Sequence, residues 1–274
     1  MASKAHLNQV IASHLIEIRA DEMPDKEIYI FENGEHGEDI LTYRILHERS
    51  NKIARLFMDK GIGKGDTFAI YMRNHPEFVC GMMAGITLGA IAVPVDPRNK
   101  GQRLKFLLNN CKARAVIVSG ECLEDLEAVI TDVPTLRFIT VAYQPGQNAA
   151  VSAKHHALNE VMEKDTWKPV EQQIMDVRHP MQIIYTSRTT GDPKGVMIRN
   201  NRTGLFNILN SIVWKYKSDD ILYNGLSLTH GNAQAVTLFP ALSLGVKAVF
   251  SPRFTKSRIW DICRKYGCTS FSLL

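Results

Sequence analysis

One stretch of the chain follows a short apolar segment and reads Tyr185-Thr186-Ser187-Arg188-Thr189-Thr190-Gly191-Asp192-Pro193-Lys194-Gly195. The segment 182–186 before it predicts a strand. Hydroxyl side chains can donate hydrogen bonds to phosphate oxygens, glycine lets a ligand approach the backbone closely, and lysine supplies a positive charge. The stretch is therefore predicted to be a phosphate-binding loop.

Two other nucleotide-binding loops do not fit this stretch. A P-loop requires G-x-x-x-x-G-K-[ST], but Gly191 is followed by Asp192 and Lys194 is followed by Gly195. The dinucleotide fingerprint G-x-G-x-x-G occurs nowhere in the chain. A P-loop ATPase or kinase is therefore disfavoured, and a Rossmann dinucleotide site has no support.

Outward from this loop, helical and strand patterns alternate from about residue 43 onward. Helices are predicted over 43–60, 78–89, 103–110, 121–131, 202–215, 233–244 and 256–266, and strands over 67–72, 90–95, 115–118, 137–141, 182–186, 220–226, 247–251 and 268–273. This alternation predicts an α/β fold with parallel-rich sheets flanked by helices. We expect residues 1–175 to form a first α/β subdomain, and 176–274 to begin a second that carries the phosphate loop. The polar stretch 143–153 is predicted to be a surface loop.

The composition is that of a globular protein, with 45% hydrophobic and 22% charged residues among 274. The net charge is only +5 and no long run of Lys and Arg occurs, so nucleic acid is not an expected partner. The five cysteines form no CxxC pair, which argues against a disulfide framework or a four-cysteine zinc site. Reduced thiols are typical of the cytoplasm, and no metal ligand is assigned.

The stretch 78–95 is apolar and uncharged throughout, which meets the lower length limit of a membrane span. It also fits a helix that ends near Gly89 followed by a strand over 90–95, and this buried helix–strand unit is favoured. The N-terminal residues lead into no apolar segment, so no signal peptide is predicted. We expect a cytoplasmic protein without a transmembrane segment.

Residues 185–196 resemble the signature YTSGTTGxPKGV of the adenylate-forming (AMP-binding) superfamily at every position except Arg188. That superfamily contains acyl-CoA synthetases, luciferases and nonribosomal peptide adenylation domains. Other segments resemble it in the same order: Leu41-Thr42-Tyr43, Gly61-Ile62-Gly63-Lys64-Gly65-Asp66, Asn74-His75-Pro76-Glu77-Phe78, Leu88-Gly89-Ala90, Val93-Pro94-Val95-Asp96-Pro97 and Leu228-Thr229-His230-Gly231. The resemblance covers about 40–274 and is nearest to the N-terminal portion of carboxylate–CoA ligases, including those acting on carnitine-like or fatty acids.

The resemblance implies an ATP-dependent reaction on a small-molecule carboxylate. An acyl-adenylate would form, and the thiol of coenzyme A would then displace AMP. The ATP phosphates would be held by Thr186, Ser187, Thr189, Thr190, Gly191 and Lys194. Mg²⁺ would sit on those phosphates and offset their charge. His230 would line the acyl pocket near the carboxylate or thiol, although a loop histidine satisfied by the backbone is the alternative.

The chain departs from the family at Arg188, where the signature has glycine. An arginine there would obstruct the nucleotide or the loop conformation, or it would add a guanidinium that grips phosphate. We favour impairment, and count Arg188 among the residues facing the phosphates.

The family's later motifs, including its catalytic lysine, have no counterpart in the sequence, so no catalytic residue is assigned. The chain stops inside a predicted strand and looks like an inactive or impaired piece of an acyl-CoA synthetase. The alternative is a non-catalytic binding or interaction protein that retains the fold. An exposed sheet edge would favour self-association or dependence on a partner.

Overall fold

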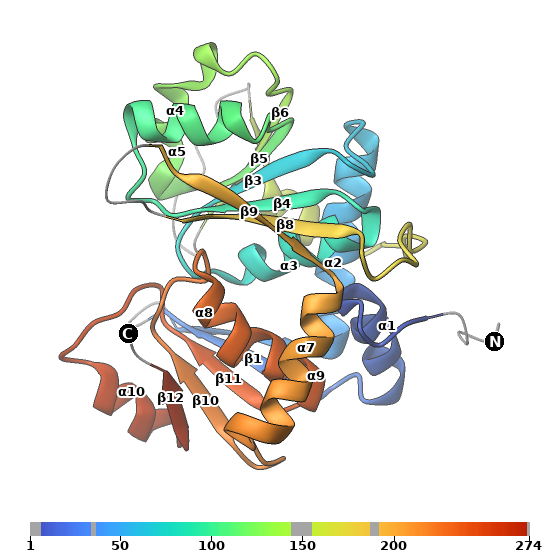
Figure 1. The fold of residues 1–274 in the computed structure, drawn as a ribbon, viewed down its shortest axis with the longest axis vertical. Coiled ribbons are helices and arrows are strands. Elements are labelled where there is room, and N and C mark those ends of the chain that lie inside the picture. The colour runs from blue at the N-terminus through green and yellow to red at the C-terminus, as the bar shows by residue number, and fades with distance from the viewer. Residues whose placement is uncertain (1–6, 34–36, 144–154, 187–191, 273–274) are drawn as a thin grey trace.

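The computed structural model describes residues 7–33, 37–143, 155–186 and 192–272, which form two mixed sheets with helices between and outside them (Figure 1). The five-stranded sheet has the order β12-β10-β11-β1-β2 and the seven-stranded sheet the order β7-β6-β5-β3-β4-β8-β9. All neighbouring strands are parallel except the pairs β1–β2 and β8–β9. The predicted α/β class with parallel-rich sheets is confirmed.

The strands of the five-stranded sheet are β1 (Glu27–Glu32), β2 (Glu38–Thr42), β10 (Ile221–Asn224), β11 (Lys247–Phe250) and β12 (Ser270–Ser272). Those of the seven-stranded sheet are β3 (Thr67–Tyr71), β4 (Ile91–Val95), β5 (Ala115–Ser119), β6 (Phe138–Ala142), β7 (His156–Ala157), β8 (Pro180–Thr186) and β9 (Lys194–Arg199). Each sheet takes strands from both sides of residue 175, so the predicted boundary does not separate the sheets.

The helices that pack on these sheets are α1 (Ala12–Glu22), α2 (Tyr43–Asp59), α3 (Pro76–Leu88), α4 (Gly101–Asn110), α5 (Leu123–Glu127), α6 (Leu158–Met162), α7 (Asn201–Leu209), α8 (Gly231–Ala233), α9 (Phe239–Leu244) and α10 (Ile259–Tyr266). Helix α7 continues into a π-helical turn, Asn210–Trp214, and a second π-helical turn, Gln234–Leu238, lies between α8 and α9. Figure 1 shows α4 and α5 beyond the seven-stranded sheet and α10 beyond the five-stranded sheet.

The apolar stretch 78–95 is a buried helix followed by a buried strand. Pro76 occupies the first turn of α3, and Gly89 ends it in the left-handed conformation with φ +70°. Every residue of α3 and β4 is buried. Over the described residues, we find no helix with the length and apolarity needed to cross a bilayer.

The central strands are apolar throughout because both of their faces are buried. Along β3, Phe68 and Ile70 pack into the core between the two sheets, whereas Ala69 and Tyr71 pack into the core beneath α4. Successive residues of a strand point to opposite faces. A sheet covered by helices on both sides therefore needs apolar residues at every position.

Two parts of the fold differ from the sequence expectation. No element was predicted before residue 43, but α1, β1 and β2 lie there, and β1 inserts between β2 and β11. The strand predicted over 182–186 is confirmed as the end of β8, but no strand was predicted after the loop, where β9 begins at Lys194 and pairs antiparallel with β8. Of the predicted surface loop 143–153, only Tyr143 lies among the described residues.

Candidate functional site

A pocket lies at the carboxyl ends of β4 and β8. The two strands are parallel neighbours, with Ala92 opposite Gln182, so Asp96 after β4 and Thr186 at the end of β8 reach the same edge of the sheet. This edge is where α/β proteins usually bind ligands. The pocket has a volume of about 540 Å3 and is lined by Pro94, Asp96, Arg98, Asn99, Arg103, Leu107, Ile184, Tyr185, Thr186, Pro193, Thr229, His230 and Gly231.

Two of the residues singled out in the sequence, Thr186 and His230, line this one pocket. Lys194 is exposed at the start of β9, next to Pro193 of the pocket wall, and does not itself line the cavity. The remaining residues predicted to face phosphate lie outside the described residues: Ser187, Arg188, Thr189, Thr190 and Gly191. Thr186 and Pro193, from the two ends of the predicted phosphate loop, therefore line the same pocket as His230.

The polar centre of the pocket is formed by Asp96, Arg98 and His230. Arg98 donates from Nε to Asp96 Oδ1 and from Nη2 to Asp96 Oδ2, each at 2.9 Å. Its Nη2 also lies 3.3 Å from Nε2 of His230. Because a guanidinium carries only donors, Nε2 of a neutral His230 accepts this bond, which leaves the ring proton on Nδ1. The imidazole is thus oriented by its neighbours while half of it stays exposed.

Arg98 also sets the charge state of Asp96. Burial by itself would raise the pKa of Asp96, but the hydrogen bonds and the positive charge of Arg98 outweigh it and hold the pKa below its usual range. Both carboxylate oxygens are already occupied by Arg98. Asp96 is therefore a positioning residue for the arginine and the histidine, rather than a free proton acceptor.

The segment that carries His230 is fixed by the buried side chain of Asn74. Asn74 Nδ2 donates to the carbonyl oxygens of Leu226 at 2.8 Å and Ser251 at 2.9 Å. Its Oδ1 accepts from the backbone N–H of Leu228 at 2.7 Å. One amide thus satisfies three backbone groups that lie outside the regular strands, which holds the turn before His230 in place.

A second buried contact joins this segment to β8. Gln182 Nε2 donates to Gln234 Oε1 at 2.7 Å, and Gln234 Nε2 donates to the carbonyl oxygen of Leu228 at 2.8 Å. Both glutamine side chains are almost completely buried. The strand that enters the phosphate loop is thereby connected to the segment that holds His230.

An adjoining pocket of about 590 Å3 shares Asp96, Arg98 and His230 with the first. Its remaining wall includes the cations Arg73, Lys100 and Arg253 together with Phe254. The Asp96–Arg98–His230 cluster therefore lies between two neighbouring spaces, both with cationic walls.

Sequence comparison decides the family. The profile of the AMP-binding enzyme family matches residues 16–274.

The chain belongs to the AMP-binding enzyme family.

Among curated members of this family, long-chain fatty acid transport protein 6 of Mus musculus is 27% identical over 259 residues, which is 92% of this chain and 39% of that protein. Crotonobetaine/carnitine–CoA ligase of Citrobacter koseri is 26% identical over 245 residues, covering 89% of this chain and 47% of the ligase. The chain thus spans less than half the length of these relatives and corresponds to their N-terminal portion.

Solved structures show the same fold. The anthranilate CoA ligase AuaEII in complex with anthranoyl-AMP matches with a TM-score of 0.85 at 20% identity, over 95% of this chain and 49% of the ligase. The crystal structure of a protein described as a putative long-chain-fatty-acid CoA ligase from Rhodopseudomonas palustris matches with a TM-score of 0.81 at 17% identity, over 96% of this chain and 63% of that one.

The side chains that line the pocket at the ends of β4 and β8 suit the phosphate chain of a nucleotide better than a metal ion bound directly by the protein. Arg98 and Arg103 provide positive charge in the pocket, and Thr186 provides a hydroxyl. Within the described part of the chain, no three His, Cys, Asp or Glu side chains gather as metal ligands.

Several site residues were not assigned from the sequence. Asp96 and Asn74 lay in segments quoted only for their resemblance, and Arg98, Gln182 and Gln234 were not considered. Asp96 carried a usable signal, since a polar residue directly after a buried parallel strand lies at the ligand-binding edge. Gln182 and Gln234 carried none, because they are far apart in the sequence and only the fold brings them together.

Proposed function

We propose that the chain is part of an ATP-dependent carboxylate–CoA ligase, in which an acyl-adenylate forms and then becomes an acyl-CoA thioester. The observation that carries this proposal is the pocket in which both ends of the signature loop meet His230. ATP, Mg²⁺ and coenzyme A would be the co-reactants, and the substrate a small carboxylic acid such as a fatty or carnitine-like acid. Membership of the AMP-binding family supports this chemistry.

The proposed roles follow from charge and position. Lys194, Arg98 and Arg103 would offset the negative charge of the phosphates and of the departing pyrophosphate. His230, oriented through Arg98, would contact the carboxylate or the acyl-adenylate formed from it. The adjoining pocket, with Arg73, Lys100 and Arg253 on its wall, offers a separate space for the negatively charged thiol substrate.

We further propose that these 274 residues, taken alone, do not form acyl-adenylate. Arg188 stands where the signature has glycine, and the family's catalytic lysine has no counterpart in this sequence.

We also propose a cytoplasmic location, with which the five free cysteines in the structure agree.

We also propose self-association through the exposed sheet edge at β9. Val196 and Met197 of this strand are exposed hydrophobic residues, and an uncovered strand edge can pair with another chain.

The test is nucleotide binding by the purified chain, measured by calorimetry with Mg-ATP. Lys194→Gln and Arg103→Gln are each expected to weaken binding several-fold, because each removes a charge near the phosphates. Lys64→Gln removes an equally exposed cation elsewhere and is the matched control. ATP affinity that is the same in all three variants would refute the phosphate site.

Two further measurements separate the enzyme from a non-catalytic relative. Arg188→Gly restores the family signature and is expected to tighten ATP binding. Exchange of labelled pyrophosphate into ATP, with a panel of carboxylic acids, is expected to stay at background for the unchanged chain. Clear exchange would show that the 274 residues are not impaired. Failure of Arg188→Gly to improve ATP binding would favour the non-catalytic alternative.

A further inference from the structure

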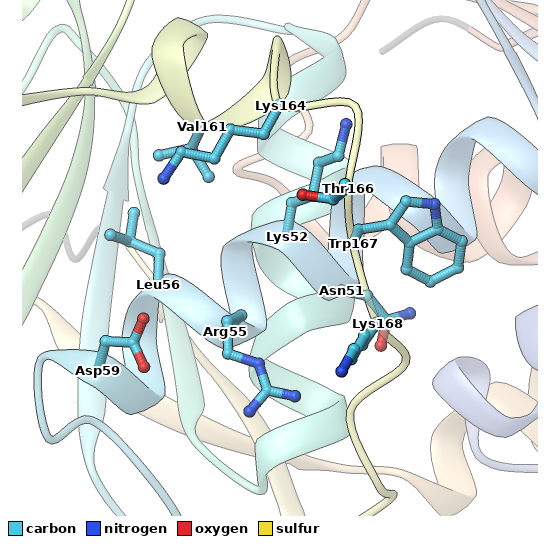
Figure 2. Close-up of a pocket in the computed structure, with 10 residues that line it drawn as sticks. All are labelled: Asn51, Lys52, Arg55, Leu56, Asp59, Val161, Lys164, Thr166, Trp167 and Lys168. Atoms are coloured by element: carbon cyan, nitrogen blue, oxygen red, sulfur yellow. The ribbon is translucent and has the colours of Figure 1, made fainter.

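A separate pocket lies between α2 and the segment 163–170, which follows α6. We call this segment the strap. Figure 2 shows the strap running across α2, with side chains from both enclosing a space of about 430 Å3. The lining residues are Asn51, Lys52, Arg55, Leu56, Asp59, Val161, Lys164, Thr166, Trp167 and Lys168. None of them lines either pocket of the candidate site.

The two walls of this pocket are joined by a buried and a partly buried hydrogen bond, from Asn51 and Lys52 of α2. Asn51 Oδ1 accepts from the backbone N–H of Val170 at 2.6 Å, and its Nδ2 donates to the carbonyl oxygen of His47 at 2.7 Å. Lys52 Nζ donates to the carbonyl oxygen of Met162 at 2.8 Å. The strap is therefore fixed at both of its ends to one face of α2, and the pocket is preformed.

Lys52 is already neutralised within this framework. Its side chain is only 7% exposed and forms an ion pair of 2.6 Å with Glu48. A buried cation of this kind needs such a partner. Lys52 therefore has a structural role in the pocket wall, and the other cations are the candidates for ligand binding.

Three further cations, Arg55, Lys164 and Lys168, line the pocket from both walls. Within the part of the chain that the structure describes, none of the three has a carboxylate partner. Figure 2 shows the charged ends of Arg55 and Lys168 toward one end of the pocket and that of Lys164 at the other end, beside Val161. The single carboxylate among the lining residues is Asp59. The lining thus carries an excess of positive charge, with Arg55, Lys164 and Lys168 against the single carboxylate of Asp59.

Like charges gathered around a preformed cavity are stabilised by a bound anion. A phosphate group fits this setting because it carries more than one negative charge and accepts several charge-assisted hydrogen bonds. Thr166 and Asn51 add polar side chains to the lining. We propose that the pocket between α2 and the strap binds a small molecule through its phosphate or pyrophosphate group.

Trp167 provides a direct readout because it lies on the strap and lines the pocket. It packs edge-on against His47, with ring centroids 5.4 Å apart. The chain has 3 tryptophans, so Trp214→Phe and Trp260→Phe together leave Trp167 as the only tryptophan, which can be excited selectively over tyrosine. In this background, inorganic pyrophosphate is titrated at 150 mM NaCl, where non-specific surface attraction is screened.

We expect a saturable change of Trp167 fluorescence with a midpoint on the order of 1 mM or tighter. Arg55→Gln with Lys168→Gln is expected to weaken the midpoint about tenfold. Lys64→Gln with Arg137→Gln removes the same charge from exposed positions outside the pocket and should leave it unchanged. Lys194→Gln should also leave it unchanged, which separates this site from the proposed ATP site.

Asp59→Asn removes the only carboxylate among the pocket-lining residues and is expected to tighten binding several-fold. Acetate, with one charge, should bind at least tenfold more weakly than pyrophosphate. The same series with AMP tests whether a nucleoside adds affinity to the phosphate. An unsaturated signal, an equal midpoint in the Arg55/Lys168 variant, or equal affinity for acetate would overturn the proposal. Far-ultraviolet circular dichroism confirms that each variant is folded.

Discussion

Strands β4 and β9 lie on either side of β8 in the same sheet, yet they are buried to opposite degrees. All residues of β4 are buried, because α-helices cover both faces of the sheet there. On β9, the neighbouring residues Val196 and Met197 are 42% and 51% exposed. Since neighbours on a strand point to opposite faces, both faces of β9 are open over the described residues.

The candidate site therefore lies between the fully buried strand β4 and the exposed edge strand β9. The predicted phosphate loop lies in the sequence between β8 and β9, and β9 is the edge strand of the seven-stranded sheet. His230 and Asp96 are held on the packed side by Asn74 and Arg98. We infer that the histidine side of the pocket is preorganised.

The largest expected effect compares two valines. Val93→Ala on β4 removes side-chain volume from a position with 0% exposure and should cost about 2–3 kcal/mol of unfolding free energy. Val196→Ala on β9 should cost less than about 0.5 kcal/mol, as exposed substitutions usually do. Urea unfolding of both variants measures the difference. Equal losses would show that β9 is covered in solution.

The next effect concerns the link between β8 and the His230 segment. Gln182→Ala leaves the buried Oε1 of Gln234 without its donor, which should destabilise the fold by about 1–3 kcal/mol. It should also weaken ATP binding, because the segment before His230 loses its support. Gln173→Ala, at an exposed position, is the control for both measurements. ATP affinity unchanged in Gln182→Ala would show that this link does not position the site.

A smaller, pH-dependent effect comes from Asp96, whose pKa is lowered in the folded chain. A carboxylate with a lowered folded pKa contributes stability above its unfolded pKa of about 3.9, and that stability is lost as the pH falls through the folded value. Asp96→Asn should therefore cost about 1 kcal/mol at pH 7, and the cost should shrink below about pH 4. Urea unfolding from pH 7 to pH 3.5 checks this. A gap that widens on acidification would contradict it.

The smallest effect on folding, but a direct test of the open edge, is Val196→Lys. We expect a change in unfolding free energy within about 0.5 kcal/mol and reduced self-association, because charge on an edge strand opposes pairing. Met58→Lys, at an α2 residue that is also 42% exposed, is the matched control. Sedimentation velocity over a range of concentrations measures both. A parent chain that stays monomeric at high concentration would refute association through β9.

Local signals predicted much of the fold because they act within a few residues. Gly89 ends α3, and the helix–strand reading of 78–95 was correct. The same kind of reasoning missed the strands before residue 43. Strand β1 pairs in parallel with β11, which is more than 200 residues away along the chain, and no local pattern encodes that partner.

The sequence by itself determined the family, since a long run of specific residue types survives in one uninterrupted stretch around the loop at 185–195. The tertiary structure decided which groups meet that loop. Asp96 and Arg98 follow β4 of the seven-stranded sheet, whereas His230 comes after β10 of the five-stranded sheet, so only the packing of the two sheets brings them into one cluster. It also decided that β9 stays open, because burial depends on which other elements pack against a strand rather than on the strand's own residues.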